Sequence, residues 1–191
     1  QINITWINAR VIKNINNKLK NVDAVIVPGG FDKSGTDQMI NAINYCRINK
    51  IPFLGICLGM QLAIIEFAKN VLNIKNPNSQ ELSKFHDDIL VIKLMEKWTD
   101  NNNFEVRKTL GNKNGTGRVG EFCIQLKQNS FVHKLYNNSN KIFKIFRHRY
   151  DMDPHFIQQF QKKNMIISGL CLNNKIPLIF GLAYALDSLT K

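Results

Sequence analysis

The first half of the chain alternates between short apolar runs and segments with helical spacing. Residues 23–30, DAVIVPGG, form a continuous apolar run that ends in Pro-Gly-Gly, and residues 51–56, IPFLGI, form another. Such runs, stopped by turn residues, predict buried strands. Residues 36–49 carry apolar side chains at helical spacing, and residues 61–72 predict a second helix. Strands and helices that alternate through short connections predict parallel strands covered by helices, an α/β fold.

The rest of the chain shows a different pattern. Further strands are predicted at residues 2–7, 89–95, 104–110, 121–126, 141–146 and 165–169, with polar turns between those of the middle region. Residues 155–164 predict a short helix, and residues 177–189, PLIFGLAYALDSL, predict a closing helix. We therefore expect a mainly parallel central sheet flanked by helices, with an additional antiparallel strand region, in one domain over residues 1–191.

Composition indicates an ordinary globular protein, since 44% of the residues are hydrophobic and 21% are charged. No stretch approaches the roughly 20 apolar residues of a membrane span, so we expect no membrane partner. The N-terminal residues lack the basic-then-apolar order of a signal peptide. Four cysteines, Cys46, Cys57, Cys123 and Cys171, lie far apart without a CxxC pair. This spacing argues against a metal site or a disulfide framework and predicts reduced thiols in a cytoplasmic protein.

The formal net charge of +12 raises the question of nucleic-acid binding. The basic residues are mostly lysines, scattered along the chain among many Asn and Ile residues. This distribution favours the coding bias of an AT-rich genome over a basic binding face, so we expect no nucleic-acid partner. A basic nucleic-acid binder remains an alternative, and it would show affinity that falls steeply with salt.

The segment GICLG, residues 55–59, carries the strongest chemical signal. A strand that ends at Gly55-x-Cys57-x-Gly59 and passes straight into a helix forms a nucleophile elbow, in which the flanking glycines allow a sharp turn. The helix N-terminus should favour the thiolate of Cys57. The N–H of Leu58 and the Gly29-Gly30 turn would supply donors for an oxyanion. These groups suit acyl transfer to a thiol.

Several segments resemble one enzyme family. PGGF (28–31) and FLGICLGMQ (53–61) resemble the class I glutamine amidotransferases, which hydrolyse glutamine with a Cys-His-Glu triad and pass on the ammonia. NSQE (78–81), GTGRVG (115–120) and FRHRYDMDP (146–154) are closer to the branch that serves the ATP-dependent conversion of UTP to CTP. The resemblance implies that family's fold and a glutaminase activity for this chain.

The resemblance also implies roles for single residues. Cys57 matches the nucleophile, and Gly30 and Leu58 match the oxyanion hole and contact the substrate. Gln61, Glu81 and Arg149 match the residues that hold glutamine. The chemistry agrees, because the α-ammonium of glutamine requires a carboxylate and its α-carboxylate requires a guanidinium.

For glutamine hydrolysis itself the resemblance implies no metal and no cofactor. For the complete enzyme it implies ATP, UTP, Mg²⁺ and the activator GTP, a synthase (amidoligase) domain in the same polypeptide, and a homo-oligomer, a tetramer. The segment GTGRVG also matches G-x-G-x-x-G, but it opens no predicted helix within a βαβ unit, so we reject a dinucleotide site there. A contact between Arg118 and a regulatory nucleotide is a further implication.

The sequence departs from the family at the catalytic base. The family carries a His-Pro-Glu motif before its last helix, and none of His86, His133, His148 and His155 lies in such a motif. Either residues are missing from the sequence near 169–177, or the protein has lost its triad partners. We favour the first explanation because the rest of the glutamine site is present. The alternatives are a non-catalytic regulatory or assembly domain, and the glutaminase of another class I enzyme, such as the one that forms GMP.

Overall fold

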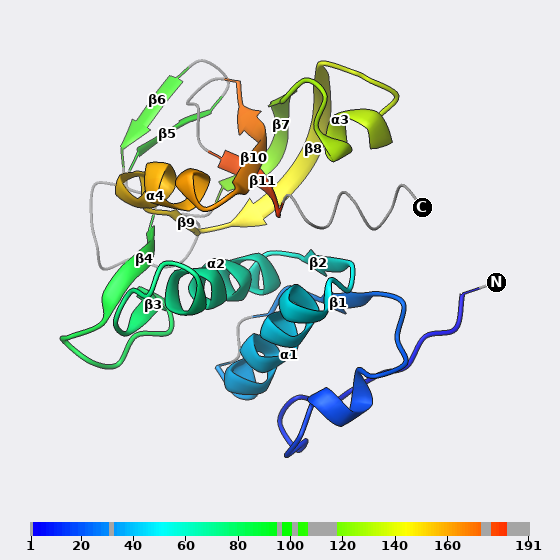
Figure 1. The fold of residues 1–191 in the computed structure, drawn as a ribbon. Helices are drawn as coiled ribbons and strands as arrows, with labels where there is room; N and C mark the ends of the chain where they lie inside the picture. Colours follow the sequence, from blue (N-terminus) through cyan, green and yellow to red (C-terminus); the bar gives the residue numbers. More distant parts are fainter. Residues whose placement is uncertain are drawn as a thin grey trace.

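The computed structural model describes residues 2–30, 33–94, 97–100, 103–106, 118–172 and 177–182 (Figure 1). The helices are α1 (Thr36–Asn49), α2 (Leu58–Asn70), α3 (Phe131–Leu135) and α4 (Ile157–Lys162), with short 3-10 helices η1 (Asn16–Lys18) and η2 (Pro154–Phe156). The strands are β1 (Val25–Val27), β2 (Phe53–Gly55), β3 (Pro77–Ser79), β4 (Ile89–Leu94), β5 (Lys97–Asp100), β6 (Asn103–Val106), β7 (Arg118–Leu126), β8 (Lys141–His148), β9 (Tyr150–Met152), β10 (Met165–Cys171) and β11 (Pro177–Leu182).

The strands form both parallel and antiparallel sheets. β1 pairs with β2 in parallel, and β3 pairs in parallel with β4, whose other edge pairs antiparallel with β9. A four-stranded antiparallel sheet has the order β11-β10-β7-β8, and β5 and β6 form a separate antiparallel pair. The expected α/β class is therefore confirmed. Among the described strands, antiparallel pairing extends further than the sequence pattern indicated.

Helix α2 is the centre of the fold and lies between α1 on one side and α4 and β9 on the other (Figure 1). Nearly all of its surface is buried, including Leu62, Ile64, Phe67 and Ala68, which are at most 2% exposed. A helix that is apolar on all sides requires packing partners on all sides. The ring of Phe67 stacks on that of Phe160 in α4, with the two centroids 5.3 Å apart. The core thus holds α2, and with it the segment before α2, in a fixed position.

Helix α1 has the bounds predicted from the sequence, Thr36–Asn49. Its helical spacing buries Ala42, Ile43 and Cys46 on one face. The helix ends because Lys50 adopts a left-handed conformation with φ of 57°, and its N–H donates to the carbonyl of Cys46. Only Ile51 and Pro52 separate Lys50 from β2, so the connection from α1 to β2 has the short length expected of a parallel β-α-β arrangement.

Two predictions of secondary structure were wrong. Residues 2–7 form no strand, and Ile2, Ile4 and Trp6 are 88%, 70% and 88% exposed. Alternation alone does not make a strand, because an extended segment needs a neighbour for its backbone groups. The segment 177–182 forms strand β11 instead of the start of a helix, since it pairs with β10 from Met165↔Leu182 to Leu170↔Pro177. Tertiary pairing here overrides a weak local preference.

Some of the sequence predictions concern residues that the structure does not describe, and others agree with the structure. Residues 107–110, 173–176 and 183–189 are outside the described residues, so a gap in the sequence near 169–177 stays a prediction. The single-domain boundary also stays a prediction. Arg118 opens strand β7 and no helix, which agrees with the rejection of a dinucleotide fingerprint. None of the helices within the described ranges has the length and apolar character needed to cross a bilayer.

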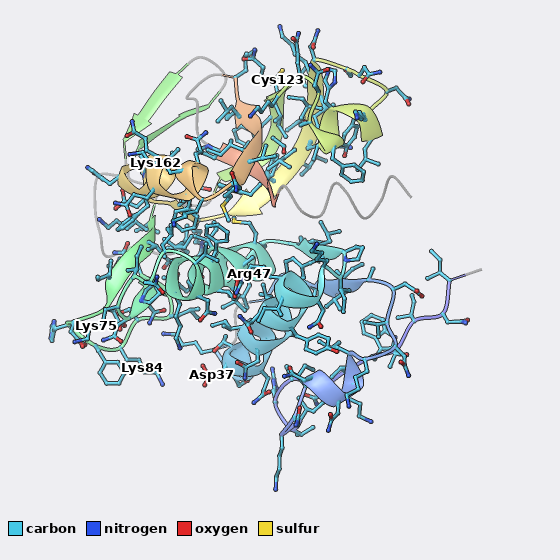
Figure 2. The ribbon with its side chains drawn as sticks, in the orientation of Figure 1. Asp37, Arg47, Lys75, Lys84, Cys123 and Lys162 are labelled. Carbon is cyan, nitrogen blue, oxygen red and sulfur yellow. The ribbon has the colours of Figure 1, made fainter. Side chains whose placement is uncertain are left out.

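A buried ion pair joins the two main helices. Glu66 of α2 is 1% exposed, and Arg47 of α1 donates to it from Nε at 3.0 Å and from Nη2 at 2.8 Å (Figure 2). Asn44 and Asn70 donate to the same carboxylate at 2.8 and 3.0 Å. A buried carboxylate is tolerated only with such partners. The network therefore fixes how α1 sits on α2.

We predict that Arg47→Met lowers the free energy of unfolding by about 3 kcal/mol, because it leaves a buried carboxylate without its cation. Urea unfolding of the two proteins measures this difference. The double variant Arg47→Met/Glu66→Met should recover part of the loss, since it removes both charges. A single variant as stable as the unmodified protein would contradict the assigned role of the pair.

Candidate active site

Cys57 stands at the joint between β2 and α2, where the backbone takes an unusual conformation. Its φ is 54° and its ψ is −104°, and α2 begins at the next residue. A positive φ is costly for a residue with a Cβ, by about 1–3 kcal/mol, and persists only where the surroundings impose it. This strained strand-to-helix turn is the geometry of a nucleophile elbow. The local structure predicted from the sequence is present.

The glycines beside Cys57 are required by close backbone contacts. A Cβ on Gly59 would overlap the carbonyl oxygen of Val27 in β1. A Cβ on Gly55 would lie 2.6 Å from the carbonyl carbon and oxygen of Gly59. The N–H of Ile56 donates to the same Val27 oxygen at 3.0 Å. A side chain at Gly59 would push the start of α2 away from the end of β1, and one at Gly55 would push it away from β2, so only glycine at both positions allows the elbow.

The Gly29-Gly30 turn that follows β1 lies against the elbow. A Cβ placed on Gly29 would be 3.2 Å from the Cβ of Cys57 and 3.9 Å from its Sγ. A Cβ on Gly30 would be 3.5 Å from Cδ2 of Leu58. The structure therefore brings both expected oxyanion-hole positions, Gly30 and Leu58, beside the cysteine. Their donation to an oxyanion stays a prediction.

The protonation of Cys57 differs from the expectation. Burial raises the pKa of the Cys57 thiol, the backbone N–H of Leu58 lowers it, and the negative charge of Glu81 raises it further. The helix N-terminus acts in the predicted direction, but the loss of solvation outweighs it. The predicted preference for thiolate was wrong for the protein without substrate. The half-buried thiol needs a proton acceptor or a change of local charge to become a nucleophile.

Gln61 and Glu81 are joined by a buried serine that sequence reasoning missed. The hydroxyl of Ser79 donates to Oε1 of Gln61 at 3.1 Å and accepts the N–H of Glu81 at 3.2 Å. Ser79 is 0% exposed and Gln61 is 2% exposed. Gln61 is also held by its own N–H, which donates to the carbonyl of Cys57 at 3.1 Å. Ser79 belongs to the NSQE segment, so the motif itself was the available signal.

Arg149 directly precedes strand β9, and the Glu81 turn follows strand β3 of the same three-stranded sheet. The N–H of Gln80 donates to the carbonyl of Ile92, and its Oε1 accepts the N–H of Leu94 at 2.8 Å. Leu94 is paired with Tyr150, the residue after Arg149. Gln80 therefore ties the turn that carries Glu81 to strand β4, which pairs with β9. Arg149 itself is half-buried, and no sequence pattern indicated the linking role of Gln80.

Two of the four histidines have hydrogen-bond partners other than Cys57 in the described structure. Nε2 of His133 lies 3.4 Å from Oδ1 of Asn140, and Nδ1 of His155 lies 2.7 Å from Oδ1 of Asp153. His86 is exposed in a loop, and the side chain of His148 lies outside the described residues. Sequence reasoning assigned none of the four as the base, and that assignment is unchanged.

The other cysteines differ from Cys57 in exposure and setting. Cys46 and Cys171 are each 1% exposed, and burial raises the pKa of Cys46 to about 11. Cys123 lies in β7 (Figure 2) and is half-buried. Within the described ranges, no group of His, Cys, Asp and Glu side chains has the arrangement of a metal site. We therefore expect Cys123 to compete with Cys57 for small labelling reagents.

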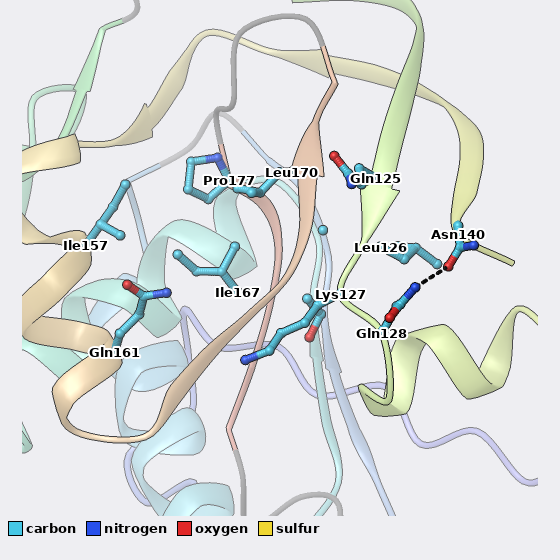
Figure 3. A pocket seen from close by; sticks show the side chains of 12 residues that line it. Gln125, Leu126, Lys127, Gln128, Asn140, Ile157, Gln161, Ile167, Leu170 and Pro177 are labelled. Carbon is cyan, nitrogen blue, oxygen red and sulfur yellow. Dashed lines mark hydrogen bonds between the residues drawn. The ribbon is translucent and has the colours of Figure 1, made fainter. Parts of the chain in front are cut away.

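A separate cavity of about 830 Å³ lies between the end of β7, α4, β10 and β11 (Figure 3). Its polar lining includes Gln125, Lys127, Gln161 and Ser168. None of the residues predicted for the glutamine site lines it. Its described lining also contains no cysteine, so the candidate active site is the elbow and not this cavity.

The strained cysteine and the glycine turn beside it form a nucleophile-elbow arrangement on an α/β fold. The family model for glutamine amidotransferase class-I matches residues 1–183, and the chain belongs to this family. Two curated relatives within this family are CTP synthases. That of Pelagibacter ubique is 44% identical over 184 residues, which are 95% of this chain and 34% of that protein. That of Lawsonia intracellularis is 40% identical over 185 residues, 95% of this chain and 33% of that protein.

A solved structure gives the same relationship. The glutaminase domain of Trypanosoma brucei CTPS, with bound acivicin, superposes with a TM-score of 0.76 and 26% identity, over 90% of this chain and 62% of that one. This chain therefore shares the fold of a CTPS glutaminase domain. It spans about a third of the length of the curated relatives that it matches.

We predict that Gly59→Ala prevents the elbow from forming and lowers the free energy of unfolding by more than about 2 kcal/mol, because its Cβ overlaps the Val27 carbonyl. Gly30→Ala is the matched control, since its Cβ would make only an ordinary contact at 3.5 Å. Thermal and urea unfolding measure both. Equal stability of the two variants would show that Gly59 does not limit the packing of α2 on β1.

Proposed function

We propose that this chain is the glutamine-hydrolysing part of a CTP synthase, in which it releases ammonia for the ATP-dependent amination of UTP. Support comes from the matching family model, from relatives named CTP synthase, and from the likeness to a CTPS glutaminase domain. The strained cysteine with its neighbouring carboxylate agrees with the chemistry of that reaction.

The observation that carries the proposal is the strained strand-to-helix turn at Cys57, with the Gly29-Gly30 turn beside it. The charge of Glu81 contributes to the raised pKa of the Cys57 thiol, which supports the proposal that both side chains belong to one site. A ligand whose ammonium pairs with Glu81 is then held beside the sulfur. Arg149 is the proposed partner for the α-carboxylate of glutamine, and Gln61 supplies an additional amide. These contacts suit a zwitterionic amino acid.

The reaction follows from these positions. The sulfur of Cys57 attacks the carboxamide carbon of glutamine, and the resulting oxyanion accepts hydrogen bonds from the N–H groups of Leu58 and Gly30. The C–N bond then breaks, and the nitrogen takes up the proton that the thiol has given up and leaves as ammonia. Water attacks the thioester, which returns the thiol and releases glutamate. No metal or cofactor takes part in these proposed steps.

The second candidate is a non-catalytic domain that keeps the fold and the glutamine site but not the base. Two observations favour testing it: burial and Glu81 raise the pKa of Cys57, and the hydrogen bonds of His133 and His155 are made with Asn140 and Asp153. Release of ammonia from glutamine separates the candidates. A glutaminase releases ammonia continuously, whereas a domain without its base binds glutamine and releases little.

The remaining proposals concern the complete enzyme. Because the relatives are about three times as long, we propose a synthase domain as the partner of this chain in one polypeptide. ATP, UTP, Mg²⁺ and the activator GTP would act there, with a tetramer as the assembly. We also propose a cytoplasmic location.

We predict that a glutamine-analogue diazo-ketone modifies Cys57 and leaves the other cysteines unmodified, because recognition by the glutamine site is needed to deliver it. Mass spectrometry of peptides identifies the site. Cys123 is the internal control, since a small alkylating agent without glutamine features should reach this half-buried thiol as well. Labelling that L-glutamine does not suppress, or that spreads over several cysteines, would refute the proposed site.

The pH profile of Cys57 alkylation should reflect the raised pKa. We expect the rate to be still increasing above pH 9, the ordinary value from which burial and Glu81 raise it. Glu81→Gln should move the midpoint to lower pH, because it removes a negative charge that opposes the thiolate. A midpoint that stays in place in this variant would contradict the proximity of Glu81 and Cys57.

We predict that Arg149→Ala weakens glutamine binding far more than Arg147→Ala, by about 2–3 kcal/mol, because a charged hydrogen-bond partner of the α-carboxylate is lost. Calorimetry on a Cys57→Ala background, which prevents turnover, measures both affinities. Arg147, two residues earlier in the chain, is the matched control. Equal losses for the two variants would mean that the carboxylate partner is misassigned.

A further inference from the structure

Ser79 occupies a distorted position at the end of β3. The parallel register with β4 runs Pro77↔Ile89 and Asn78↔Leu90, but Ser79 is opposite Ile92, so β4 contains one extra residue at this point. Such bulges re-aim side chains near functional sites. The N–H of Ser79 accordingly leaves the strand pattern and donates to Oδ1 of Asn78 at 2.8 Å. The distortion directs a fully buried hydroxyl toward α2.

The same residue holds the turn that carries Glu81. The carbonyl of Ser79 accepts the N–H groups of Leu82 and Ser83 at 2.9 and 2.8 Å. Its hydroxyl accepts the N–H of Glu81 at 3.2 Å. Three consecutive backbone donors are therefore satisfied by one serine. The position of the Glu81 backbone depends directly on this residue.

The hydroxyl proton of Ser79 determines the orientation of the Gln61 amide. Within the described part of the chain, the acceptor found for this proton is Oε1 of Gln61, at 3.1 Å. An oxygen turned toward Ser79 leaves the Nε2 donor of Gln61 for other partners. A donor suits the α-carboxylate of an amino acid, whereas an oxygen in its place would repel it.

We infer that Ser79 is a positioning residue of the glutamine site, whose buried hydroxyl orients the Gln61 amide from α2 and fixes the Glu81 turn from β3. This inference rests on the proposed function for the identity of the ligand only. The two proposed ligand-binding residues, Gln61 and Glu81, come from different elements of the fold, and the Ser79 hydroxyl is hydrogen-bonded to both. Its removal would leave a buried amide oxygen and a backbone N–H without partners.

The test compares Ser79→Ala and the near-isosteric Ser79→Cys with Ser130→Ala. Ser130 is the matched control, since it is also buried and its hydroxyl accepts a backbone N–H, that of His133, at 3.1 Å. Two quantities are measured: the Kd of L-glutamine on the Cys57→Ala background, and the midpoint pH of Cys57 alkylation by iodoacetamide. We expect both Ser79 variants to bind glutamine about tenfold more weakly or worse.

The alkylation midpoint of the Ser79 variants should also move to lower pH, because a loosened turn no longer holds the Glu81 charge beside the thiol. Ser130→Ala should change neither quantity, even where it lowers stability. Ser79 variants with unchanged affinity and midpoint would overturn the inference. If the parent protein binds no glutamine, the proposed function fails, and the midpoint alone decides: a shift supports the positioning role and an unchanged value overturns it.

Discussion

The contact between Gly59 and the carbonyl of Val27 is the constraint on which the site depends. It brings the first turn of α2 against the end of β1, and a side chain at Gly59 would separate them. Once this contact is made, the single residue between Ile56 and Leu58 has to reverse the chain, which gives Cys57 its positive φ of 54°. The strain is sustained because α2 is packed on nearly every side. The packing of α2 in the core and the position of the Cys57 thiol at the elbow thus depend on the same contact.

Helix α2 buries two polar side chains and uses them differently. Glu66 is surrounded by Arg47, Asn44 and Asn70, so its carboxylate is fully occupied and serves to dock α1. The side-chain oxygen of Gln61 accepts a hydrogen bond from the Ser79 hydroxyl, which leaves its amide nitrogen available to donate to a ligand. Burying a polar group is tolerated when it is paired, and the number of partners limits what else it can bind. The two residues, five positions apart, therefore separate a structural role from a ligand-binding one.

The sequence predicted the elements whose signals are local and missed the features set by distant neighbours. Helix α1 could be placed to the residue, because its apolar spacing follows a polar start at Thr36 and Asp37. The elbow was predictable because two glycines at fixed offsets specify it. Residues 2–7 and 177–182 were misassigned, since strand formation depends on a pairing partner that the local pattern does not contain. The roles of Ser79 and Gln80 and the direction of the Cys57 pKa depend on burial and on contacts from other elements.

The raised pKa of Cys57 links substrate binding to activation of the nucleophile. Glu81 opposes the thiolate in the protein without substrate, and an α-ammonium bound to Glu81 would offset that charge. Binding of a zwitterionic amino acid should thus lower the pKa of the thiol, and by linkage the thiolate should strengthen the binding. Burial, however, is the largest cause of the raised pKa, and a bound substrate excludes more water. Compensation of Glu81 alone therefore removes only part of the rise in the pKa, so the proposed reaction requires a group that accepts the proton of the thiol.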